Sequence, residues 1–562
     1  MRNEFPNPME RRERWQPLNG KWLFSFDKPI YDREIEVPFA YQTEASGVNE
    51  KEHHETVWYK RDVILNDEMK SSERVVVRFL AVDYEATVFV NGRFACFHAG
   101  GYEAFSVDIT DLITREKETI EVKVADPLDA DRPRGKQDWN ENPSRCWYYQ
   151  TTGIWQSVWL EGYGSDYIRS FGITPDAEKT DVRFDVSLAS GEAETIVVDI
   201  ESQFFDGPLT FTASVARKRK VVLVANLPKP DLVYDKHLWS PAAPNLYRAT
   251  IKTITCGRIS DEVKTHFAFR TVEARNGKIL LNGVPFEPKM VLDQGYWRSG
   301  GMTAPSARSF EEDILAAKAM GFNAARKHQK VEDPYFYYYA DVHGFPVWAE
   351  TPSAYEFGKH EIATVIATQL ALIDKVYNHP SVIAYVPFNE SWGILEVAKN
   401  KQEQSFVRAV TELIRARDGG KIVIGNDGWE TLDCSDIITV HDYSSFGDDF
   451  AEKYTEPNES DTPVGRRITV EGGVIGDKPV MLSEFGGISL SEKAGWGYGE
   501  DVGDEKEYIN RLERLIDNYK KTRLWGWCFT QLTDVEQETN GLLDSDHKPK
   551  FDVEKIKKAI SK

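Results

Sequence analysis

The first part of the chain consists of short runs in which hydrophobic and polar residues alternate. Such runs occupy residues 20–26 and 86–90, and the pair Asn91-Gly92 follows the second of them. An Asn-Gly pair between two alternating runs is a strong signal for a β-hairpin. No helical pattern interrupts the runs, so the pattern predicts a β-sandwich over residues 1–164. A polar, proline-bearing loop at 131–143 lies between its last strands, and loops of that length are usually functional or mobile.

A second block of alternating runs covers residues 165–273. The runs at 182–188 and 221–224 are examples. A block of about 100 residues built from short strands is typical of an immunoglobulin-like β-sandwich, which we expect here.

From residue 274 to 562 the pattern changes, and short apolar runs alternate with helical periodicity. The eight strand candidates are residues 287–292, 323–326, 345–349, 382–388, 421–425, 437–440, 479–483 and 524–528. Helical spacing of apolar residues occurs at 309–320, 361–377, 404–417 and 506–521, with a short helix at 553–560. Eight such units in about 285 residues predict a (β/α)8 TIM barrel. A doubly wound open sheet is the alternative, but no Gly-rich phosphate loop follows the first strand.

Length and charge narrow the class of protein. A chain of 562 residues is too long for one core, so we expect three or four domains. The formal net charge of -21 argues against nucleic acid and anionic membranes as partners, because both attract basic surfaces. Aromatic residues make up 12% of the chain, which suits stacking on sugar rings but equally suits the cores of β-sandwiches.

Cysteine usage and the N-terminal segment predict a location. The cysteines are odd in number, widely spaced and without a CxxC pair, which argues against a disulfide framework or a zinc site. They are Cys96, Cys146, Cys256, Cys434 and Cys528. The N-terminal residues lack a signal-peptide pattern, and no apolar run is long enough to cross a membrane. We therefore expect a soluble, cytoplasmic protein.

Polar or aromatic residues follow nearly every predicted barrel strand. They are Asp293 and Gln294; Arg326 and His328; Glu350; Asn389 and Glu390; Asn426, Asp427 and Trp429; His441, Asp442 and Tyr443; Glu484; and Trp527. Any one of them could cap a loop or form an ion pair. Because the carboxyl ends of barrel strands meet at one face, their convergence predicts an active site there. Glu390 and Glu484 are the most informative, since two carboxylates that face each other across a sugar can break a glycosidic bond.

A series of segments in a fixed order carries a resemblance to a known family. The segments are Leu18-Asn-Gly-Lys-Trp22, Thr152-Gly-Ile-Trp-Gln-Ser-Val-Trp-Leu160, Phe269-Arg-Thr271 before Leu281-Asn-Gly283, Asn323-Ala-Ala-Arg-Lys-His328, Asp341-Val-His-Gly344, Asn378-His-Pro-Ser381, Asn389-Glu390 and Ser483-Glu-Phe-Gly486. The chain resembles glycoside hydrolase family 2, which includes β-galactosidases, β-glucuronidases and β-mannosidases. The resemblance covers nearly the whole chain. It implies a jelly-roll sugar-binding domain, an immunoglobulin-like domain and a catalytic barrel, in agreement with the three blocks.

The resemblance also implies roles for individual residues. Glu390 is similar to the family's acid/base and Glu484 to its nucleophile. Such a retaining pair should lie about 5–5.5 Å apart, and the acid should have a raised pKa. The resemblance implies that Arg326 and Tyr443 keep the nucleophile ionised and that Asn389 binds the sugar 2-hydroxyl. The remaining substrate-binding candidates are His328, His441, Asp293, Glu350, Trp429 and Trp527, the last as the floor of the sugar subsite.

Departures from the family pattern concern the sugar. Many galactosidases and glucuronidases have an Asp where this chain has Trp147, and Gln329-Lys330 replaces a Tyr-Pro pair. The Asn-x-Lys motif of glucuronidases is here Asn540-Gly541-Leu542, which disfavours glucuronate. Other cations could still bind a carboxylate, namely Lys327, Lys330, His547 and Lys548.

The resulting expectation is a retaining exo-glycosidase that acts on a small glycoside or oligosaccharide. Galactose is the first choice of sugar because it is the family's commonest substrate. The alternatives are a β-glucuronidase, a β-galacturonidase or an α-L-arabinofuranosidase of the same family. No cofactor is expected to be required; some relatives use an auxiliary Mg ion, whose ligands cannot be assigned. The oligomeric state is open, with a homo-oligomer among the options.

Two other classes of protein are disfavoured. A non-catalytic carbohydrate-binding protein would retain the sandwiches and lose a catalytic carboxylate, but both Glu390 and Glu484 are present. A metal-dependent hydrolase needs clustered ligands, and the 11 histidines show no HxH or HExxH spacing.

Overall fold

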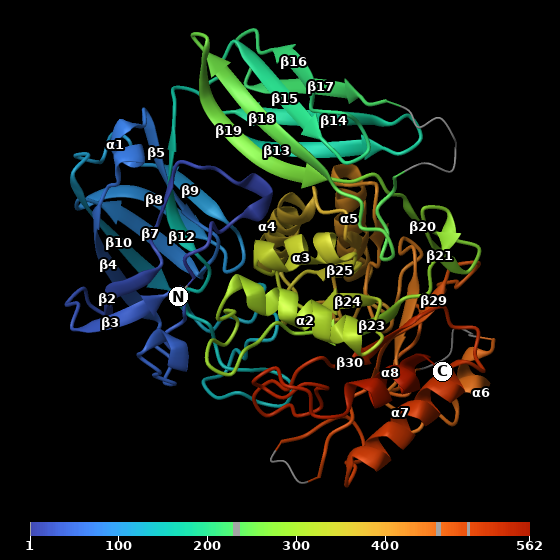
Figure 1. The fold of residues 1–562 in the computed structure, drawn as a ribbon. Helices are drawn as coiled ribbons and strands as arrows, with labels where there is room; N and C mark the ends of the chain where they lie inside the picture. Colours follow the sequence, from blue (N-terminus) through green and yellow to red (C-terminus); the bar gives the residue numbers. More distant parts are fainter. Residues whose placement is uncertain (1, 229–236, 457–461, 492–494, 562) are drawn as a thin grey trace.

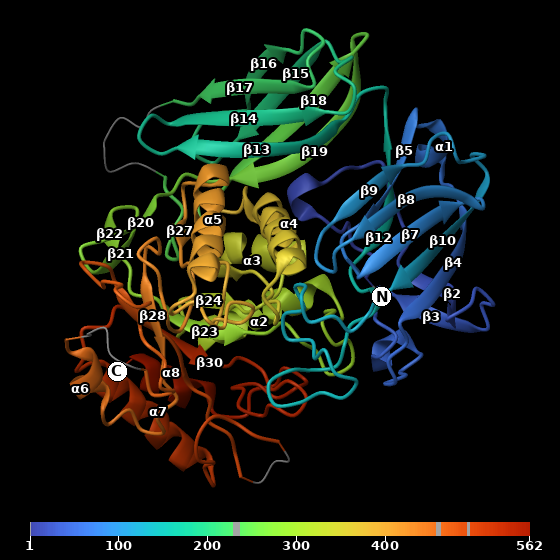
Figure 2. The same cartoon turned by 180° about the vertical axis from the view of Figure 1, so that it is seen from behind.

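A computed structural model describes residues 2–228, 237–456, 462–491 and 495–561. Two β-sandwiches and a barrel are visible in Figure 1, with the first sandwich (blue) beside the barrel and the second (green) across the top of both. The view from behind in Figure 2 gives the same arrangement. The expected fold class, two β-sandwiches followed by a TIM barrel, is confirmed, while the exact boundaries at 164/165 and 273/274 stay predictions.

The first sandwich packs a six-stranded sheet, with the order β3-β2-β4-β10-β7-β8, on a four-stranded sheet with the order β1-β12-β5-β9. Alternate residues of β10, including Ile120, Val122 and Val124, are buried in its core, as a period of two requires. The strands are β1 (Trp15–Pro17), β2 (Gly20–Phe26), β3 (Arg33–Val37), β4 (Thr56–Ile64), β5 (Arg74–Phe79), β6 (Val82–Asp83), β7 (Glu85–Val90), β8 (Arg93–Ala99), β9 (Phe105–Asp108), β10 (Lys117–Ala125), β11 (Gly153–Ile154) and β12 (Val158–Tyr163). Short helices are η1 (Pro8–Glu10), η2 (Glu44–Ser46) and α1 (Asp67–Ser71).

The second sandwich has a three-stranded sheet, β13-β14-β17, facing a four-stranded sheet, β16-β15-β18-β19. All its pairings are antiparallel, as in an immunoglobulin-like fold. The strands are β13 (Ile168–Asp176), β14 (Asp181–Leu188), β15 (Thr195–Glu201), β16 (Leu209–Ser214), β17 (Lys220–Asn226), β18 (Tyr247–Thr255) and β19 (Arg258–Phe267). A small sheet of β20 (Val272–Arg275), β21 (Lys278–Leu281) and β22 (Val284–Pro285) follows before the barrel.

Eight parallel strands form the barrel, and they follow one another around it in chain order. They are β23 (Lys289–Asp293), β24 (Ala324–Lys327), β25 (Val347–Glu350), β26 (Val382–Val386), β27 (Ile422–Val423), β28 (Ile438–His441), β29 (Val480–Gly486) and β30 (Trp527–Thr530). Each overlaps one of the eight predicted runs. No ladder joins β27 to β28, but the Asp436 amide donates to the Val423 carbonyl (2.9 Å) across that gap.

Helices surround the barrel. They are α2 (Ala307–Ala319), α3 (Pro334–His343), α4 (Lys359–Val376), α5 (Lys401–Arg417), α6 (Phe450–Tyr454), α7 (Glu505–Tyr519) and α8 (Val553–Ser561). Five of these match the predicted helices to within a few residues. Helix α3 was not predicted, although the Asp333 side chain caps it and Pro334 occupies its first turn.

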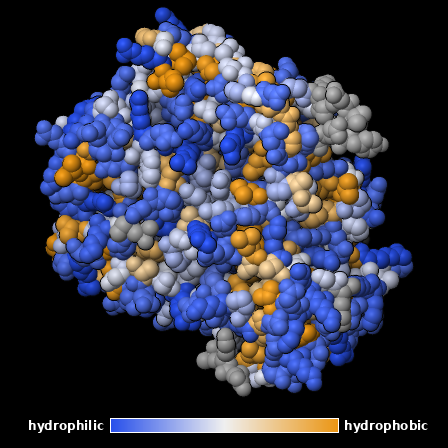
Figure 3. All heavy atoms as spheres, in the orientation of Figure 1, coloured by the Kyte–Doolittle hydropathy of each residue, from blue (hydrophilic) through white to orange (hydrophobic). Residues whose placement is uncertain are grey.

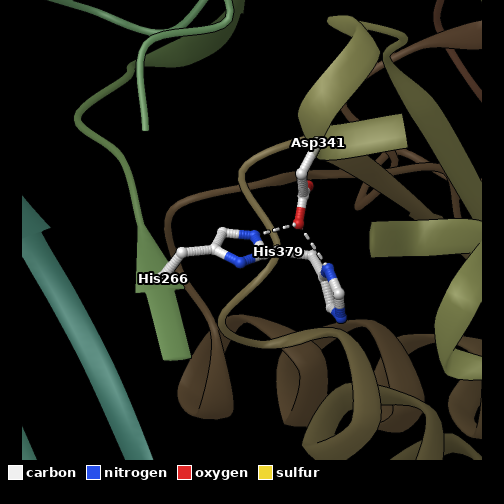
Figure 4. Close-up of side chains that lie close together, drawn as sticks. All are labelled: His266, Asp341 and His379. Carbon is white, nitrogen blue, oxygen red and sulfur yellow. Dashed lines mark hydrogen bonds and ion pairs between the residues drawn. The ribbon is translucent and has the colours of Figure 1, made fainter. Parts of the chain in front are cut away.

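A buried cluster fixes the second sandwich to the barrel (Figure 4). Asp341 of α3 accepts hydrogen bonds from His266 Nε2 of β19 (2.8 Å) and from His379 Nδ1 (2.6 Å). The backbone amide of Ser381 donates to the other carboxylate oxygen (2.9 Å). Burial raises the pKa of Asp341, but its histidine partners lower it more. The pKa of Asp341 is therefore well below its usual value, and the carboxylate is ionised. The cluster therefore joins the segment before β26 to the second sandwich.

Polar residues cover most of the face in Figure 3, and apolar residues form only small, separate patches there. No helix in the described ranges is long and apolar enough to cross a membrane. The cytoplasmic location stays a prediction.

Candidate active site

Arg326, near the end of β24, lies at the centre of the residues that follow the barrel strands. Its guanidinium donates to Glu350 Oε2 (2.6 Å), to Glu484 Oε1 (2.9 Å) and to Asn389 Oδ1 (2.7 Å). Asp427 adds an ion pair at 2.6 Å. Burial lowers the pKa of Arg326, but the three carboxylates raise it well above its usual value. This fully buried cation therefore holds the ends of four other strands in one place.

Both carboxylate oxygens of Glu484 accept hydrogen bonds. Arg326 donates to Oε1, and the Tyr443 hydroxyl donates to Oε2 (2.6 Å). The Tyr443 ring is in turn stacked on Tyr498, with ring centroids 3.9 Å apart. Glu484 is buried in β29, so its side chain has little freedom to turn away. Donors on both oxygens are the environment that suits a carboxylate nucleophile.

Glu390 faces Glu484 from the segment that follows β26. A carboxylate oxygen of each residue and a ring nitrogen of His441 all lie within 4.8 Å of one another. Glu390 sits at φ 53°, a left-handed backbone conformation that a non-glycine residue rarely adopts, and its amide donates to the Asp427 carbonyl (2.9 Å). The Glu390 side chain is 21% exposed, against 6% for Glu484. The Glu390 carboxyl is thus the more accessible of the two.

His441, the last residue of β28, joins the site through both ring nitrogens. Nδ1 donates to Glu390 Oε1 (2.8 Å) and Nε2 donates to Asp427 Oδ2 (2.7 Å), so both nitrogens carry protons. Burial lowers the pKa of His441, but the Glu484 carboxylate and these two partners raise it to about 10. The residue is therefore a cation at neutral pH.

The charged His441 has a consequence for Glu390 that contradicts the sequence expectation. Burial raises the pKa of Glu390, as expected of a catalytic acid, but the hydrogen bond and positive charge of His441 lower it more. The net shift is downward. The expectation considered Glu390 and Glu484 alone and did not include a histidine held protonated between carboxylates.

We predict that His441→Gln shifts the alkaline limb of the pH profile of kcat/KM to higher pH. The substitution removes the positive charge that favours ionised Glu390, so the pKa of Glu390 rises and its proton is kept to higher pH. The measurement is kcat/KM against pH for wild type and variant. His360→Gln, at an exposed position on α4, is the matched control. An unchanged alkaline limb in His441→Gln would contradict this account of Glu390.

Three further candidates are His328, Asp293 and Trp429. His328 Nδ1 lies 3.1 Å from Glu350 Oε1, and Asp293 forms an ion pair with Lys327 (2.7 Å). Trp429 packs edge-on against His441, with ring centroids 5.5 Å apart. His328, through Glu350, and Trp429, through His441, are thereby placed beside the catalytic residues. Asp293 is not, because its partner Lys327 lies over the Phe336 ring of α3 (4.1 Å), on the side of the sheet that faces the helices. The role predicted for Asp293 is therefore wrong, since a residue at a strand end can point outward from the barrel as well as inward.

The role predicted for Trp527 is wrong. Strand β30 begins at Trp527 rather than ending there, and Trp527 pairs with Lys289 at the start of β23. Its ring packs against Phe322 and Phe485 between the sheet and the helices and is 1% exposed. The residue that reaches the site from β30 is Thr530, whose hydroxyl lies 3.0 Å from the Tyr443 oxygen and can donate to it, since the Tyr443 proton is given to Glu484. The predicted strand ended two residues too early, so Trp527 was placed at the wrong end.

The sequence did not assign the aromatic residues that line one side of the site. Trp392 Nε1 lies 3.3 Å from Glu390 Oε2, and its ring packs against Trp147 (5.2 Å between centroids) and Tyr355 (5.5 Å). Trp139 stacks on Tyr355 at 4.1 Å. Trp139 and Trp147 belong to the first sandwich, in or just beyond the loop at 131–143. The unusual length of that loop was the only signal in the sequence.

Two groups among the described residues bring together atoms that could hold a metal ion. One is the cluster of His266, Asp341 and His379, and the other consists of Glu390, His441 and Glu484. Hydrogen bonds between the members account for the geometry of both groups. Neither has the all-oxygen ligand set that Mg²⁺ prefers, so the auxiliary magnesium considered above has no assigned ligands.

Comparison with known proteins gives family matches in the two sandwiches. The family model described as "Glycosyl hydrolases family 2, sugar binding domain" matches residues 15–161, and "Glycosyl hydrolases family 2" matches residues 166–270. A putative β-glucuronidase of Formosa agariphila is 25% identical over 70% of this chain and 48% of its own length. A β-galactosidase of Thermoanaerobacter pseudethanolicus is 24% identical over 76% of this chain and 56% of its own length. The matched part of the chain thus spans about half of each relative.

The fold is shared with a solved structure over its whole length. The crystal structure of a β-galacturonidase from Eisenbergiella tayi, bound to galacturonate, superposes with a TM-score of 0.76. The superposition covers 100% of this chain and 99% of that one, at 19% sequence identity. At this identity the likeness establishes the architecture and leaves the chemistry to be argued from the residues.

Proposed function

The chain belongs to glycoside hydrolase family 2, and on that premise we propose that it is a retaining exo-glycosidase. It would remove the terminal sugar of a glycoside by double displacement, with Glu484 as nucleophile and Glu390 as acid/base. The observation that carries the proposal is the separation of the two carboxyl groups. Oxygens of Glu390 and Glu484 lie within 4.8 Å of each other. A retaining pair is about 5–5.5 Å apart, whereas an inverting pair needs about 6.5–9.5 Å to accommodate a water molecule.

In the first step the Glu484 carboxylate attacks the anomeric carbon and forms a glycosyl ester. The bond from that carbon to the leaving oxygen breaks, and Glu390 gives its proton to this oxygen. Arg326 and Tyr443 position the attacking carboxylate through their bonds to its two oxygens. The different surroundings of the two glutamates support the assignment, because only Glu390 is exposed enough to reach a departing aglycone.

In the second step water replaces the aglycone. Glu390, now ionised, takes a proton from water, and the water oxygen attacks the anomeric carbon and releases Glu484. The hydrogen bond from His441 favours the ionised Glu390 that this step requires. The first step requires Glu390 protonated, so its lowered pKa would limit the reaction on the alkaline side.

Action on a terminal sugar is supported by the loop that leaves the first sandwich. The amides of Arg134 and Gly135 donate to the Ser353 carbonyl (2.9 and 3.0 Å), which follows β25. The aromatic group of Trp139, Trp147, Tyr355 and Trp392 lies on the same side, next to Glu390. We infer that these residues close the site on that side, so that it accepts one end of a glycoside rather than a chain that passes through.

Galactose remains the expected sugar only by its frequency in the family. Three of the four cations that the sequence offered for binding a sugar carboxylate already form ion pairs. Lys327 pairs with Asp293, Lys330 with Glu332, and His547 with Asp313. The named relatives include both a glucuronidase and a galactosidase. The glycone must therefore be argued from other residues of the site.

The reaction is tested with the nitrophenyl β-galactoside, β-glucuronide, β-galacturonide and α-L-arabinofuranoside. We expect hydrolysis of at least one, with kcat on the order of 1–1000 per second for the preferred sugar. The released sugar should first appear as the anomer of the substrate, which ¹H NMR detects before mutarotation. Sugar binding without hydrolysis of any substrate would favour the non-catalytic carbohydrate-binding protein instead.

A further inference from the structure

Lys136 enters the barrel mouth from the first sandwich. The backbone on either side of it is fixed, because its carbonyl accepts from the Tyr148 amide (2.7 Å) and the Asp138 amide donates to the Tyr148 carbonyl (2.9 Å). Gly135, at φ 62°, packs closely against residues that follow barrel strands. A Cβ there would clash with the carbonyl of Gln329, which follows β24, and lie 3.1 Å from Pro352 Cβ. The position of Lys136 is thus set by both domains.

The Lys136 ammonium is buried beside the Tyr148 ring, close enough to the active site to feel the charges of its carboxylates, and forms no ion pair with one. The side chain is 7% exposed, and its Nζ lies 5.7 Å from the centroid of the Tyr148 ring. Burial lowers the pKa of Lys136, but Cys146 and the charges of Glu538, Glu484 and Glu390 raise it, so the group is a cation. No ion pair joins it to these three carboxylates.

Other buried cations at or just after the end of β24 are paired with a carboxylate, unlike Lys136. Arg326 has Glu350 at 2.6 Å, Lys327 has Asp293 at 2.7 Å, and Lys330 has Glu332 at 2.7 Å. Within the described ranges, Lys136 forms no ion pair. A buried ammonium without a contacting anion is unfavourable by itself and binds an anionic group strongly once one is supplied.

Glu538, one of the three carboxylates that raise the pKa of Lys136, already accepts hydrogen bonds from neutral donors. Glu538 Oε2 accepts from the Tyr148 hydroxyl (2.7 Å), and Oε1 accepts from Asn540 Nδ2 (3.1 Å). Asn540 Oδ1 accepts in turn from Gln531 Nε2 (2.8 Å). Leu542, where glucuronidases have a lysine, is buried at 1% exposure. The positive charge on this side of the site therefore comes from Lys136 in the first sandwich.

We propose that Lys136 binds the carboxylate of the sugar held at the catalytic glutamates, so that the preferred substrates are β-linked uronides. This inference rests on the proposed glycosidase function and replaces galactose as the expected sugar. Arg326 and His441 are already paired with carboxylates of the site, so Lys136 is the cation that can offset the repulsion between a uronide and Glu390 and Glu484. The first sandwich would then determine specificity by contributing one charge to the barrel.

The test compares Lys136→Met, Lys136→Arg and wild type on nitrophenyl β-glucuronide, β-galacturonide and β-galactoside. We expect wild type to prefer a uronide and Lys136→Met to lower kcat/KM for it by about 100-fold or more, the effect of removing one member of a buried charge pair. Activity on the neutral galactoside should change by about threefold or less, and Lys136→Arg should retain part of the preference. Lys123→Met is the matched control, since Lys123 is on the six-stranded sheet and likewise lies near an aromatic ring (Trp58, 5.9 Å).

The outcomes separate this inference from the proposed function. Hydrolysis of the galactoside but not of the uronides, or an equal loss on both in Lys136→Met, overturns the role of Lys136 and leaves the glycosidase intact. A nitrophenyl β-galactoside 6-sulfate distinguishes a sulfate from a carboxylate as the anion: Lys136-dependent cleavage of the sulfate alone overturns the uronide assignment. Binding of free glucuronate, galacturonate and galactose by calorimetry tests Lys136 even without turnover. Equal affinity of wild type and Lys136→Met for the uronates contradicts the inference.

Discussion

Glu484→Ala is expected to lower kcat by about four orders of magnitude or more, and added azide is expected to restore turnover with inverted product. The substitution removes the atom that forms the glycosyl ester, and losses of this size follow when a member of a covalent mechanism is removed. The space left by the side chain lies beside Arg326 Nη1 and the Tyr443 hydroxyl, which contacted the carboxylate. A small anion can occupy it and attack the anomeric carbon once, which gives the α-glycosyl azide from a β-glycoside.

Kinetics with and without azide and NMR of the azide product check this expectation. Glu471→Ala, an exposed glutamate of the same domain, is the control and should keep wild-type kcat. Folding of Glu484→Ala is monitored by its thermal unfolding, because the change leaves Arg326 with one carboxylate fewer. A variant that keeps more than a few per cent of kcat, or a β-azide product, would remove Glu484 from the role of nucleophile.

Glu390→Ala is expected to lose more kcat/KM the more the leaving group depends on protonation. For a poor leaving group such as an alkyl alcohol, kcat/KM should fall by roughly 100-fold to 10,000-fold, the usual contribution of general acid catalysis. For 2,4-dinitrophenolate, which departs without a proton, the first step should be almost unaffected. The glycosyl ester then accumulates, since no base activates water, and both kcat and KM fall.

A series of aryl glycosides with leaving groups of graded acidity measures this dependence. Added azide should accelerate the second step and give the β-glycosyl azide, the opposite anomer from that of Glu484→Ala. The alkaline limb of the pH profile of kcat/KM should also be absent in Glu390→Ala, because the titration of Glu390 causes it. Equal losses for all leaving groups would mean that Glu390 does not transfer the proton.

The barrel could be predicted from the sequence because parallel strands buried on both faces read as continuous apolar runs. The run at 382–388 became β26 (Val382–Val386), and the helices with clear apolar periodicity, such as α5, were also found. Helix α3 was missed because aromatic residues lie on several of its sides, so Tyr335, Tyr337 and Tyr339 obscure any single apolar face. The hydrophobic pattern was thus sufficient to predict elements that are buried on one face only or on all sides.

For the site, the sequence could predict which residues reach the mouth but not their partners. Arg326, Asn389, Tyr443 and the two glutamates were placed together because strand ends share a face. Trp527 was misplaced because a shift of two or three residues decides which end of β30 it occupies. The lowered pKa of Glu390 and the presence of Lys136 depend on contacts between segments far apart in the chain. No spacing in the sequence encodes those distances.

Trapping the glycosyl ester tests the central claim most directly. The 2-deoxy-2-fluoro glycosyl fluoride of the sugar that the enzyme hydrolyses has a good leaving group, but its fluorine destabilises the positively charged transition states of both steps. The first step should therefore proceed and the second should stall. Mass spectrometry of the digested protein is predicted to find one label per chain, on the peptide that contains Glu484. A label on Glu390 or on any other residue, or release of sugar with inverted configuration, would contradict the account.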